Sequence, residues 1–216
     1  MPSSPQLAGR MPPPLPSQAE RRRAQLIAIA AALIESDGMD SVTMASVAEL
    51  AGCTRTQVHR YFARREDLLA AVVTDFTTRL RERLVGGDAV LTGIGESRDG
   101  SVPSGWLEAL HEAMFDVFEQ AGTAGLGLLV MPHAIARGDD PIARLRAELF
   151  SPWIDFAVGA VESRADAEIV IELWMATAYR LAARWRAGDI DRRHAVDTLT
   201  RAQNGLLRAF RKPEPS

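Results

Sequence analysis

Four consecutive residues, Thr54, Arg55, Thr56 and Gln57, are of types that hydrogen-bond to nucleic acid. The guanidinium of Arg55 can present two parallel donors to guanine, and the side-chain amide of Gln57 can pair with adenine or donate to a phosphate oxygen. Gln57 also lies three residues after Thr54, the spacing of a capping box, so its side chain has a competing role inside its own helix. If these residues form the first turn of a helix in the major groove, we expect Arg55 and Gln57 to contact bases.

Residues able to perform covalent or metal chemistry are few and poorly spaced. Cys53 is the one cysteine of the sequence, which excludes an internal disulfide framework and a multi-cysteine zinc site. The pair His111 and Glu112 lacks the second histidine of a metalloprotease helix, and the sequence has no P-loop, no dinucleotide-binding glycine pattern and no G-x-S-x-G motif. We therefore expect a protein that is not an enzyme and that has no catalytic residue, metal site or cofactor.

The chain is expected to begin folding at Ser17. Residues 1–16 hold six of the twelve prolines and little apolar periodicity, which predicts a disordered leader. Ser17 and Glu20 then have capping-box spacing in front of an alanine-rich apolar run, and Gly38 can supply the left-handed residue that ends this first helix. The predicted helix therefore precedes the segment that contains Thr54.

The next two helices are predicted to be short. Thr43 can cap a helix over 44–50, and a turn that contains Gly52 separates this helix from the one that Thr54 opens. Two short helices joined by such a turn are typical of a helix-turn-helix. A long amphipathic stretch at 66–84 follows and is expected to connect this unit to the rest of the chain.

The rest of the chain is predicted to be helical as well, so the expected fold class is all-α. Six glycines between 86 and 105 indicate a loop, and Pro152 is expected to kink or interrupt the helix that contains it after Phe150. Helical patterns lie at 105–121, 124–137, 141–163, 166–187 and 191–211. The expected organisation is a leader at 1–16, a helix-turn-helix domain at 17–65, a connecting helix at 66–84, a ligand-binding and dimerisation domain at 85–211, and a tail at 212–216.

Charge is distributed unevenly along the chain. The formal net charge is −3, but residues 1–65 hold eight arginines against five acidic residues, so this part carries +3 and the remainder −6. A basic segment on an acidic body can bind a polyanion if its positive charges share one face; otherwise the arginines are a solvated surface. No run approaches the roughly 18 apolar residues of a membrane span, and prolines follow Arg10 where a signal peptide needs an apolar region. The expected location is the cytoplasm.

The two C-terminal helical patterns carry apolar surface wider than one stripe. A surface of this width needs more than one partner to cover it, so we expect the two helices to pair with a second copy in a four-helix bundle. The alternative is that both stripes are internal core. The stripe assigned to dimerisation consists of Val170, Trp174, Thr177, Leu181, Val196, Leu199, Gln203, Leu206 and Phe210, and a neighbouring stripe holds Ile169, Leu173, Ala176 and Arg180.

The segment from Thr43 to Val72, TMASVAELAGCTRTQVHRYFARREDLLAAV, resembles the DNA-binding domain of the TetR family of transcriptional regulators. The resemblance extends to Gly38 and the helix before it, and covers about a quarter of the chain. It implies an N-terminal three-helix DNA-binding unit followed by a helical body that binds a small effector and dimerises. A dimer of this kind holds its two recognition helices about 34–36 Å apart, or somewhat farther, to meet successive faces of the major groove.

Several residues around the expected recognition helix are candidates for phosphate contacts. Thr43 and Thr54 lie at helix N-termini, where free backbone N–H groups favour a phosphate. His59, Arg60 and Arg65 are expected to hold phosphates, although His59 stands where the family commonly has a tyrosine, so its contact is expected to be weaker or pH-dependent.

Other positions depart from the family pattern or leave two readings open. Arg64 replaces the serine or asparagine that often caps the fourth helix, so this cap is expected to be weaker. Small Ala45 makes base contacts from the second helix doubtful. The three arginines at 21–23 reach either phosphates or solvent.

The body is expected to enclose an effector cavity, if the resemblance holds. Bulky and soft side chains at helical spacing can line an apolar pocket, although each is individually a candidate for plain core. The candidate wall residues are Trp106, Leu110, Met114, Phe118, Met131, Trp153, Phe156 and Trp174, and the candidate polar anchors are His111, His133, Arg137 and Tyr179.

The function that follows is a dimeric, ligand-responsive transcriptional regulator, a repressor by preference, that binds a roughly palindromic operator through the helix starting at Thr54. Its expected partners are double-stranded DNA, a second copy of the chain and a small-molecule effector of unknown identity, with no membrane. One alternative is a DNA-binding protein of the same fold that responds to a protein partner or has an architectural role. Another is a helical small-molecule carrier or enzyme without a DNA role.

Overall fold

The structure is a computed structural model that describes residues 16–85, 105–130 and 141–211. Within these ranges the protein is all-α and forms no β-strand, as the sequence predicts. No helix among these residues is both long enough and apolar enough to cross a membrane. The helices are α1 (Gln18–Asp37), the single 3₁₀ turn η1 (Met39–Ser41), α2 (Met44–Leu50), α3 (Arg55–His59), α4 (Arg65–Val85), α6 (Trp106–Ala121), α7 (Ala124–Val130), α8 (Pro141–Ala160), α9 (Arg164–Arg186) and α10 (Arg192–Ala209).

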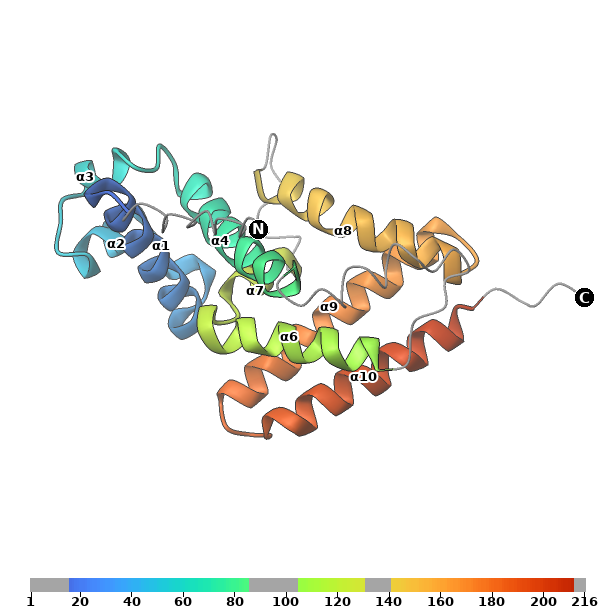
Figure 1. The fold of residues 1–216 in the computed structure, drawn as a ribbon. Coiled ribbons are helices and arrows are strands. Elements are labelled where there is room, and N and C mark those ends of the chain that lie inside the picture. Colours follow the sequence, from blue (N-terminus) through green and yellow to red (C-terminus); the bar gives the residue numbers. More distant parts are fainter. Residues whose placement is uncertain (1–15, 86–104, 131–140, 212–216) are drawn as a thin grey trace, which may run out of the picture.

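The N-terminal helices α1, α2 and α3 form a lobe at one end of the molecule (Figure 1). Its core consists of apolar side chains that each helix turns inward, including Leu26 of α1, Val47 of α2 and Val58 of α3, all fully buried. Phe62 and Leu69 close this core from the α3–α4 connection and from α4. Because the buried residues recur at helical spacing, the polar side chains of α3 are left facing outward.

The starts of these helices are fixed by capping boxes. The Ser17 hydroxyl accepts a hydrogen bond from the Glu20 backbone N–H, while the Glu20 carboxylate accepts one from the Ser17 N–H, as the spacing predicts. Thr43 caps α2 in the same way, with Ser46 as its reciprocal partner. Each cap satisfies backbone donors that the first turn of a helix leaves free and stabilises the helix by about 1 kcal/mol. The local sequence therefore sets where α1 and α2 begin.

Helix α4 runs from the N-terminal lobe into the body. Its N-terminus lacks a side-chain acceptor at Arg64, but the Asp67 carboxylate accepts a hydrogen bond from the Arg64 backbone N–H at 3.0 Å. Farther along, α4 packs against α6, α7 and α8, and the rings of Phe76 and Phe118 stack with their centroids 6.0 Å apart. Helix α4 therefore contributes buried side chains both to the N-terminal lobe and to the body.

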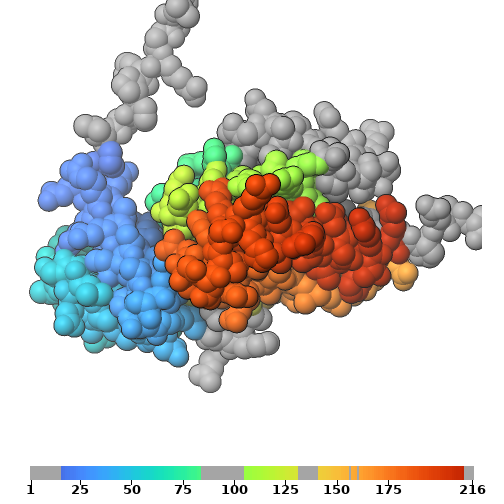
Figure 2. All heavy atoms as spheres, turned by 90° about the horizontal axis from the view of Figure 1, so that it is seen from below, coloured from blue at the N-terminus to red at the C-terminus, as the bar shows by residue number. Residues whose placement is uncertain are grey.

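The body is built from α6 to α10. Helix α6 packs against α4 on one side and α10 on the other, and α9 packs against α8 and α10. Figure 2 shows α9 and α10 side by side over one face of the body, with the N-terminal lobe set at one end. The polar face of α10 is correspondingly the outer face of the molecule, since its buried residues, among them Ala195, Val196 and Leu199, point inward.

Helix α8 differs from the sequence prediction, and two other predicted segments lie largely outside the described residues. The helix α8 continues through Pro152, which is exposed, so the predicted interruption after Phe150 is wrong. A proline costs a helix one hydrogen bond, and the packing of α8 against α4 and α9 outweighs that local cost. The predicted loop at 86–105 and the second half of the pattern at 124–137 fall outside the described residues, apart from Gly105, which precedes α6 with a φ of 80°.

Candidate nucleic-acid interface

The first turn of α3 lies on the surface of the N-terminal lobe. Thr54, Arg55, Thr56 and Gln57 are all exposed, whereas Val58 directly after them is fully buried. Burial of Val58 fixes the rotation of this short helix about its axis. The four side chains able to contact base edges therefore project from the protein together.

Gln57 takes the capping role that competes with base contact. Its Oε1 accepts a hydrogen bond from the Thr54 backbone N–H at 2.9 Å, and the Thr54 hydroxyl accepts one from the Gln57 N–H at 3.3 Å. This arrangement occupies the oxygen of the Gln57 amide and orients its NH₂ group. Gln57 can then donate to a phosphate or a base acceptor, but the two-bond pairing with adenine needs the oxygen that the cap uses. Arg55 is the better candidate for direct base reading.

His59 ends α3 with a defined ring orientation. Its Nδ1 lies 3.2 Å from the carbonyl oxygen of Ala63, which can only accept, so Nδ1 carries hydrogen in this contact. This contact fixes the orientation of the ring at the end of α3.

Arg65 differs from the expectation that it holds a phosphate. Its Nε donates to the carbonyl oxygen of Val42 and its Nη2 donates to that of Met39, both at 2.6 Å. The guanidinium thus braces the start of α4 against the connection between α1 and α2, and Asp40 lies 3.9 Å away. Surface charge in the sequence gave no sign of this role, because both acceptors are backbone atoms more than twenty positions earlier in the chain.

The three arginines near the start of α1 have separate surroundings. Arg22 donates to the carbonyl oxygen of Ala51 at 3.1 Å, which joins α1 to the turn after α2. The Arg23 guanidinium lies 5.0 Å from the centre of the Phe62 ring, a cation–π contact. Arg21 is exposed and donates to the carbonyl oxygen of Pro16. The three arginines therefore do not share one environment, and neither expectation applies to all of them.

The family model described as "Bacterial regulatory proteins, tetR family" matches residues 26–72, which run from α1 into α4. The match covers the DNA-binding part of that family's regulators, the same segment in which the sequence resembles that family. No protein with a curated function matches the sequence significantly.

Solved structures of TetR-family proteins share the whole fold. A protein from Rhodococcus sp. assigned to the TetR-family transcriptional regulators has 23% identity, covers 87% of this chain and 99% of its own, and gives a TM-score of 0.60. A TetR-like transcriptional regulator from Rhodococcus sp. RHA1 has 18% identity, covers 90% and 96%, and gives 0.58. The multidrug binding protein EbrR, complexed with imidazole, has 15% identity, covers 90% and 97%, and gives 0.52. The protein therefore has the fold of a TetR-family regulator, with its helix-turn-helix domain followed by a helical C-terminal domain.

Within the TetR fold of this chain, three tryptophans of the body form a connected group. The centres of the Trp106 and Trp153 rings lie 6.2 Å apart, and those of Trp153 and Trp174 lie 5.6 Å apart. Trp106 and Trp174 are buried and Trp153 is half-buried, so the group reaches from the core towards the surface at α8. Leu110, Met114 and Phe118 are buried on the same α6, whereas Tyr179 is half-buried with its ring against Gly127. Met131, His133 and Arg137 lie outside the described residues, as does the side chain of Phe156.

His111 is a fully buried polar residue in the middle of this core. Its Nδ1 lies 2.8 Å from the Thr200 hydroxyl, and its Nε2 lies 2.8 Å from Gln203 Oε1 and 3.0 Å from Trp174 Nε1. Gln203 Oε1 can only accept and Trp174 Nε1 can only donate, so either protonation state of Nε2 satisfies one neighbour and not the other. Burial lowers the pKa of His111 to about 4, against the opposing effect of the Gln203 hydrogen bond. The ring is therefore neutral at neutral pH.

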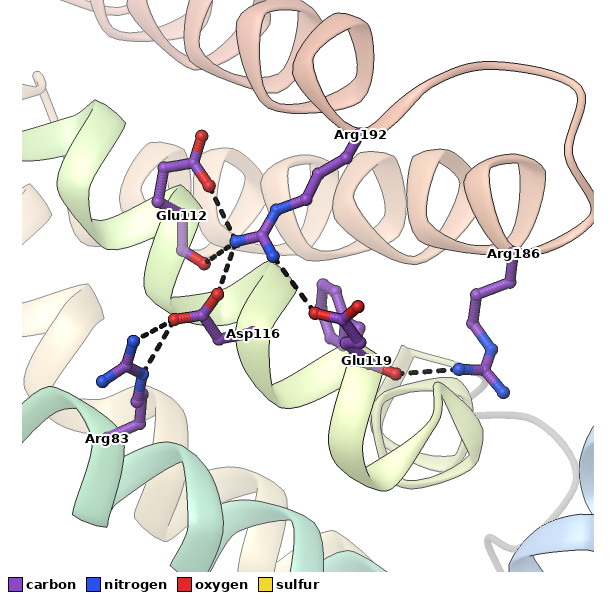
Figure 3. A network of polar contacts seen from close by, with 7 residues as sticks. Arg83, Glu112, Asp116, Glu119, Arg186 and Arg192 are labelled. Carbon is purple, nitrogen blue, oxygen red and sulfur yellow. Dashed lines mark hydrogen bonds and ion pairs between the residues drawn. The ribbon is translucent and has the colours of Figure 1, made fainter.

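Charged side chains tie α4, α6 and α10 together at the surface (Figure 3). The Asp116 carboxylate of α6 accepts hydrogen bonds from Arg83 of α4 and from Arg192 of α10. Arg192 also contacts Glu112 at 2.7 Å and Glu119 at 3.3 Å. Burial alone raises the pKa of Asp116, but the hydrogen bonds from the two arginines outweigh it and hold that pKa below its usual value. Asp116 is thus ionised and links both helices to α6.

A second polar junction joins α1 to the body. Glu35 accepts a hydrogen bond from the backbone N–H of Thr123, at the start of α7, and contacts Arg186 of α9 at 3.0 Å. Arg186 also donates to the Phe118 carbonyl oxygen at the end of α6. Gly122 has a φ of 73°, and a Cβ at this position would meet the Glu35 carboxylate, which would have to shift from its contacts. No local pattern in the sequence marks this junction, because its members lie far apart in the chain.

The stripe assigned to dimerisation lies mainly inside the chain. The chain itself covers Val170, Trp174, Val196, Leu199 and Gln203, which are at most 7% exposed and have no surface left for a partner. For these five residues the internal-core alternative holds, since α9 and α10 pack their stripes against α6. Thr177, Leu181, Leu206 and Phe210 are half-buried. The neighbouring stripe carries exposed apolar side chains instead, with Ile169 at 45% and Leu173 at 44%.

Proposed function

We propose that the protein is a dimeric transcriptional repressor that binds a palindromic DNA operator through α3 and responds to a small molecule bound in its body. The observation that carries the DNA-binding part is the outward, exposed first turn of α3 within a domain matched by the tetR family model. Arg55 reads a base, while Thr43, Thr54, Thr56, His59 and Arg60 contact the DNA backbone. A regulator of this kind acts where the chromosome is, in the cytoplasm.

Selection of bound sequences from random duplexes tests this proposal. We expect enrichment of a site with two-fold symmetry, since a dimer presents two copies of α3. On that site, Arg55→Ala should relax the preference at one position per half-site, at a cost of about 1–3 kcal/mol. Arg193→Ala, on α10, serves as a control because it removes the same charge from the body. Absence of any duplex binding at low salt would refute the proposal.

The surface proposed for dimerisation lies on α9. Exposed Ile169 and Leu173 border a groove of about 270 Å³ that is also lined by Val130, Phe150 and Met175. A second copy of the chain would cover this apolar surface in a dimer, the assembly expected of a regulator with this fold. Leu173→Glu should therefore yield a monomer in analytical ultracentrifugation. Leu50→Glu, a matched change at a 60% exposed leucine of α2, should leave the dimer intact.

The effector part of the proposal rests on the fold and on the aromatic group in the body. The similar structure named multidrug binding protein EbrR holds imidazole, which supports a small-molecule site in this fold. Because Trp106, Trp153 and Trp174 lie in contact, a ligand bound among them should change the intrinsic fluorescence. The decisive measurement is operator affinity with and without a compound found in this way. Equal affinities would reject ligand control of DNA binding.

A further inference from the structure

A basic groove lies beside the proposed recognition helix, between α1 and α3. It has a volume of about 570 Å³ and is lined by side chains from the first two turns of α1 and from the end of the helix-turn-helix. Three arginines line it, Arg21 and Arg22 from α1 and Arg60 after α3. Figure 1 shows α1 and α3 next to each other at the outer end of the N-terminal lobe. The groove is therefore continuous with the surface on which α3 is exposed.

The remaining lining residues are uncharged, and all but Ala19 carry a side-chain hydrogen-bond donor. They include Gln25, Gln57 and Tyr61, and none of the described residues that line the groove is acidic. Gln57 Oε1 is held by the Thr54 N–H at 2.9 Å, which leaves the amide NH₂ group as the free end of this side chain. With three arginines and no acidic residue, this lining favours an anion over a cation.

One of these arginines is fixed in place before any ligand arrives. Arg22 Nη2 donates to the Ala51 carbonyl oxygen at 3.1 Å, and Arg22 Nη1 donates to Gln25 Oε1 at 2.7 Å. Two contacts at separate atoms hold the plane of the guanidinium, so little side-chain entropy is lost on binding. Arg21, by contrast, is exposed and its one described contact is with the backbone of Pro16. Arg21 can turn towards an anion in the groove.

We propose that this groove seats the phosphodiester backbone of duplex DNA next to the bases that α3 reads, so that α1 forms part of the DNA-binding surface. This inference rests on the proposed DNA-binding function and extends it from α3 and Arg60 to Arg21 and Arg22 of α1. The groove is much larger than one phosphate group and is open along α1, which suits a length of backbone rather than a single ion. Contacts to phosphates do not discriminate between base pairs, but they fix the position of α3 on the duplex.

The salt dependence of binding to a mixed-sequence duplex tests the groove without knowledge of the operator. Each phosphate contact contributes about 0.9 to the slope of log affinity against log salt concentration. We expect Arg21→Gln to lower the steepness of this slope by about 0.9 and to weaken binding roughly eightfold at about 0.1 M salt. Arg21→Lys, which keeps the charge, should retain most of the slope. Arg193→Gln, an exposed arginine of α10, is the matched control and should leave the slope unchanged.

The possible outcomes separate the inference from the proposed function. If the wild type binds duplex DNA and Arg21→Gln has the same salt-dependence slope, the assignment of the groove to the DNA backbone is wrong and the proposed function stands. Equal slope changes in Arg21→Gln and Arg193→Gln would also overturn it, because the effect would then be bulk charge. Titration with inorganic phosphate forms the third arm: saturable, Arg21-dependent phosphate binding with no change in duplex slope would assign the groove to a free anion instead. Failure of the wild type to bind any duplex would remove the proposed function, and the groove assignment with it. Circular dichroism confirms that each variant is folded.

Discussion

His111 predicts a specific loss of stability in acid. In the folded protein burial lowers the pKa of this ring to about 4, whereas an unfolded chain has a histidine pKa of about 6.5. Between these two values the unfolded state binds a proton that the folded state does not, so the free energy of unfolding falls as the pH is lowered through this window. Above the unfolded pKa the contribution is fully present. The whole difference corresponds to about 3 kcal/mol, of which about 2 kcal/mol is lost by about pH 5.

The measurement is urea unfolding followed by circular dichroism at several pH values between about 7 and 5. Carboxylates also titrate near the lower end, so the result needs a variant that lacks only this ring. His111→Gln has no proton to gain, and its free energy of unfolding should fall less steeply than that of the wild type, with the two curves converging as the pH drops. The comparison uses slopes, because the substitution itself disturbs the contacts with Thr200 and Trp174.

An exposed histidine provides the control for this experiment. His194 lies in the first turn of α10 and is exposed, so His194→Gln should leave the pH dependence close to that of the wild type. If wild type and His111→Gln lost stability in parallel on acidification, the neutral buried ring would not be the cause. The argument from burial would then be refuted.

Three further predictions concern the scaffold and are checked by thermal or urea unfolding. Gly122→Ala should destabilise the protein by more than about 1–2 kcal/mol, which is the cost of a left-handed backbone alone, because its Cβ also meets Glu35. Gly188→Ala is the control: Gly188 has a φ of 81° with open space around it, so this variant should show only the backbone cost. Equal losses in both would contradict the Glu35 contact. Thr54→Ala should cost about 1 kcal/mol through the lost cap, and a smaller loss with intact α3 would show that packing fixes this helix. Arg65→Ala should cost about 2 kcal/mol of unfolding free energy, because two backbone acceptors lose a charged donor. A loss below about 0.5 kcal/mol, the range of ordinary surface substitutions, would show that these two hydrogen bonds do not stabilise the fold.

Local features of the fold were predictable from the sequence, and the reason is chemical. A capping box needs residues only three positions apart, so Ser17 with Glu20 and Thr54 with Gln57 marked the starts of α1 and α3 directly. Thr43, three residues before Ser46, marked the start of α2 in the same way. These features depend on neighbours in the chain, which the sequence displays.

Contacts between distant segments were not predictable in the same way. Helical periodicity identified Trp174 and Leu199 as apolar faces, but it cannot distinguish an interface between helices of one chain from an interface between two chains. The charge of Arg65 suggested a phosphate, because the backbone carbonyls of Met39 and Val42 that it binds have no signature in a sequence. His111 was named as a polar anchor of a cavity, whereas its partners come from two helices near the C-terminus.

The two ends of α1 have different attachments, and this has a mechanical consequence. Its first turns line the basic groove, and Glu35 near its other end is bonded to α7 and α9. A helix of 20 residues is about 30 Å long and resists bending over that distance. A tilt at Glu35 of only a few degrees would therefore swing Arg21 by about an ångström or more, comparable with the tolerance of a hydrogen bond to phosphate. Under the proposed function, α1 is therefore a second connection between the body and the DNA-binding surface, beside α4.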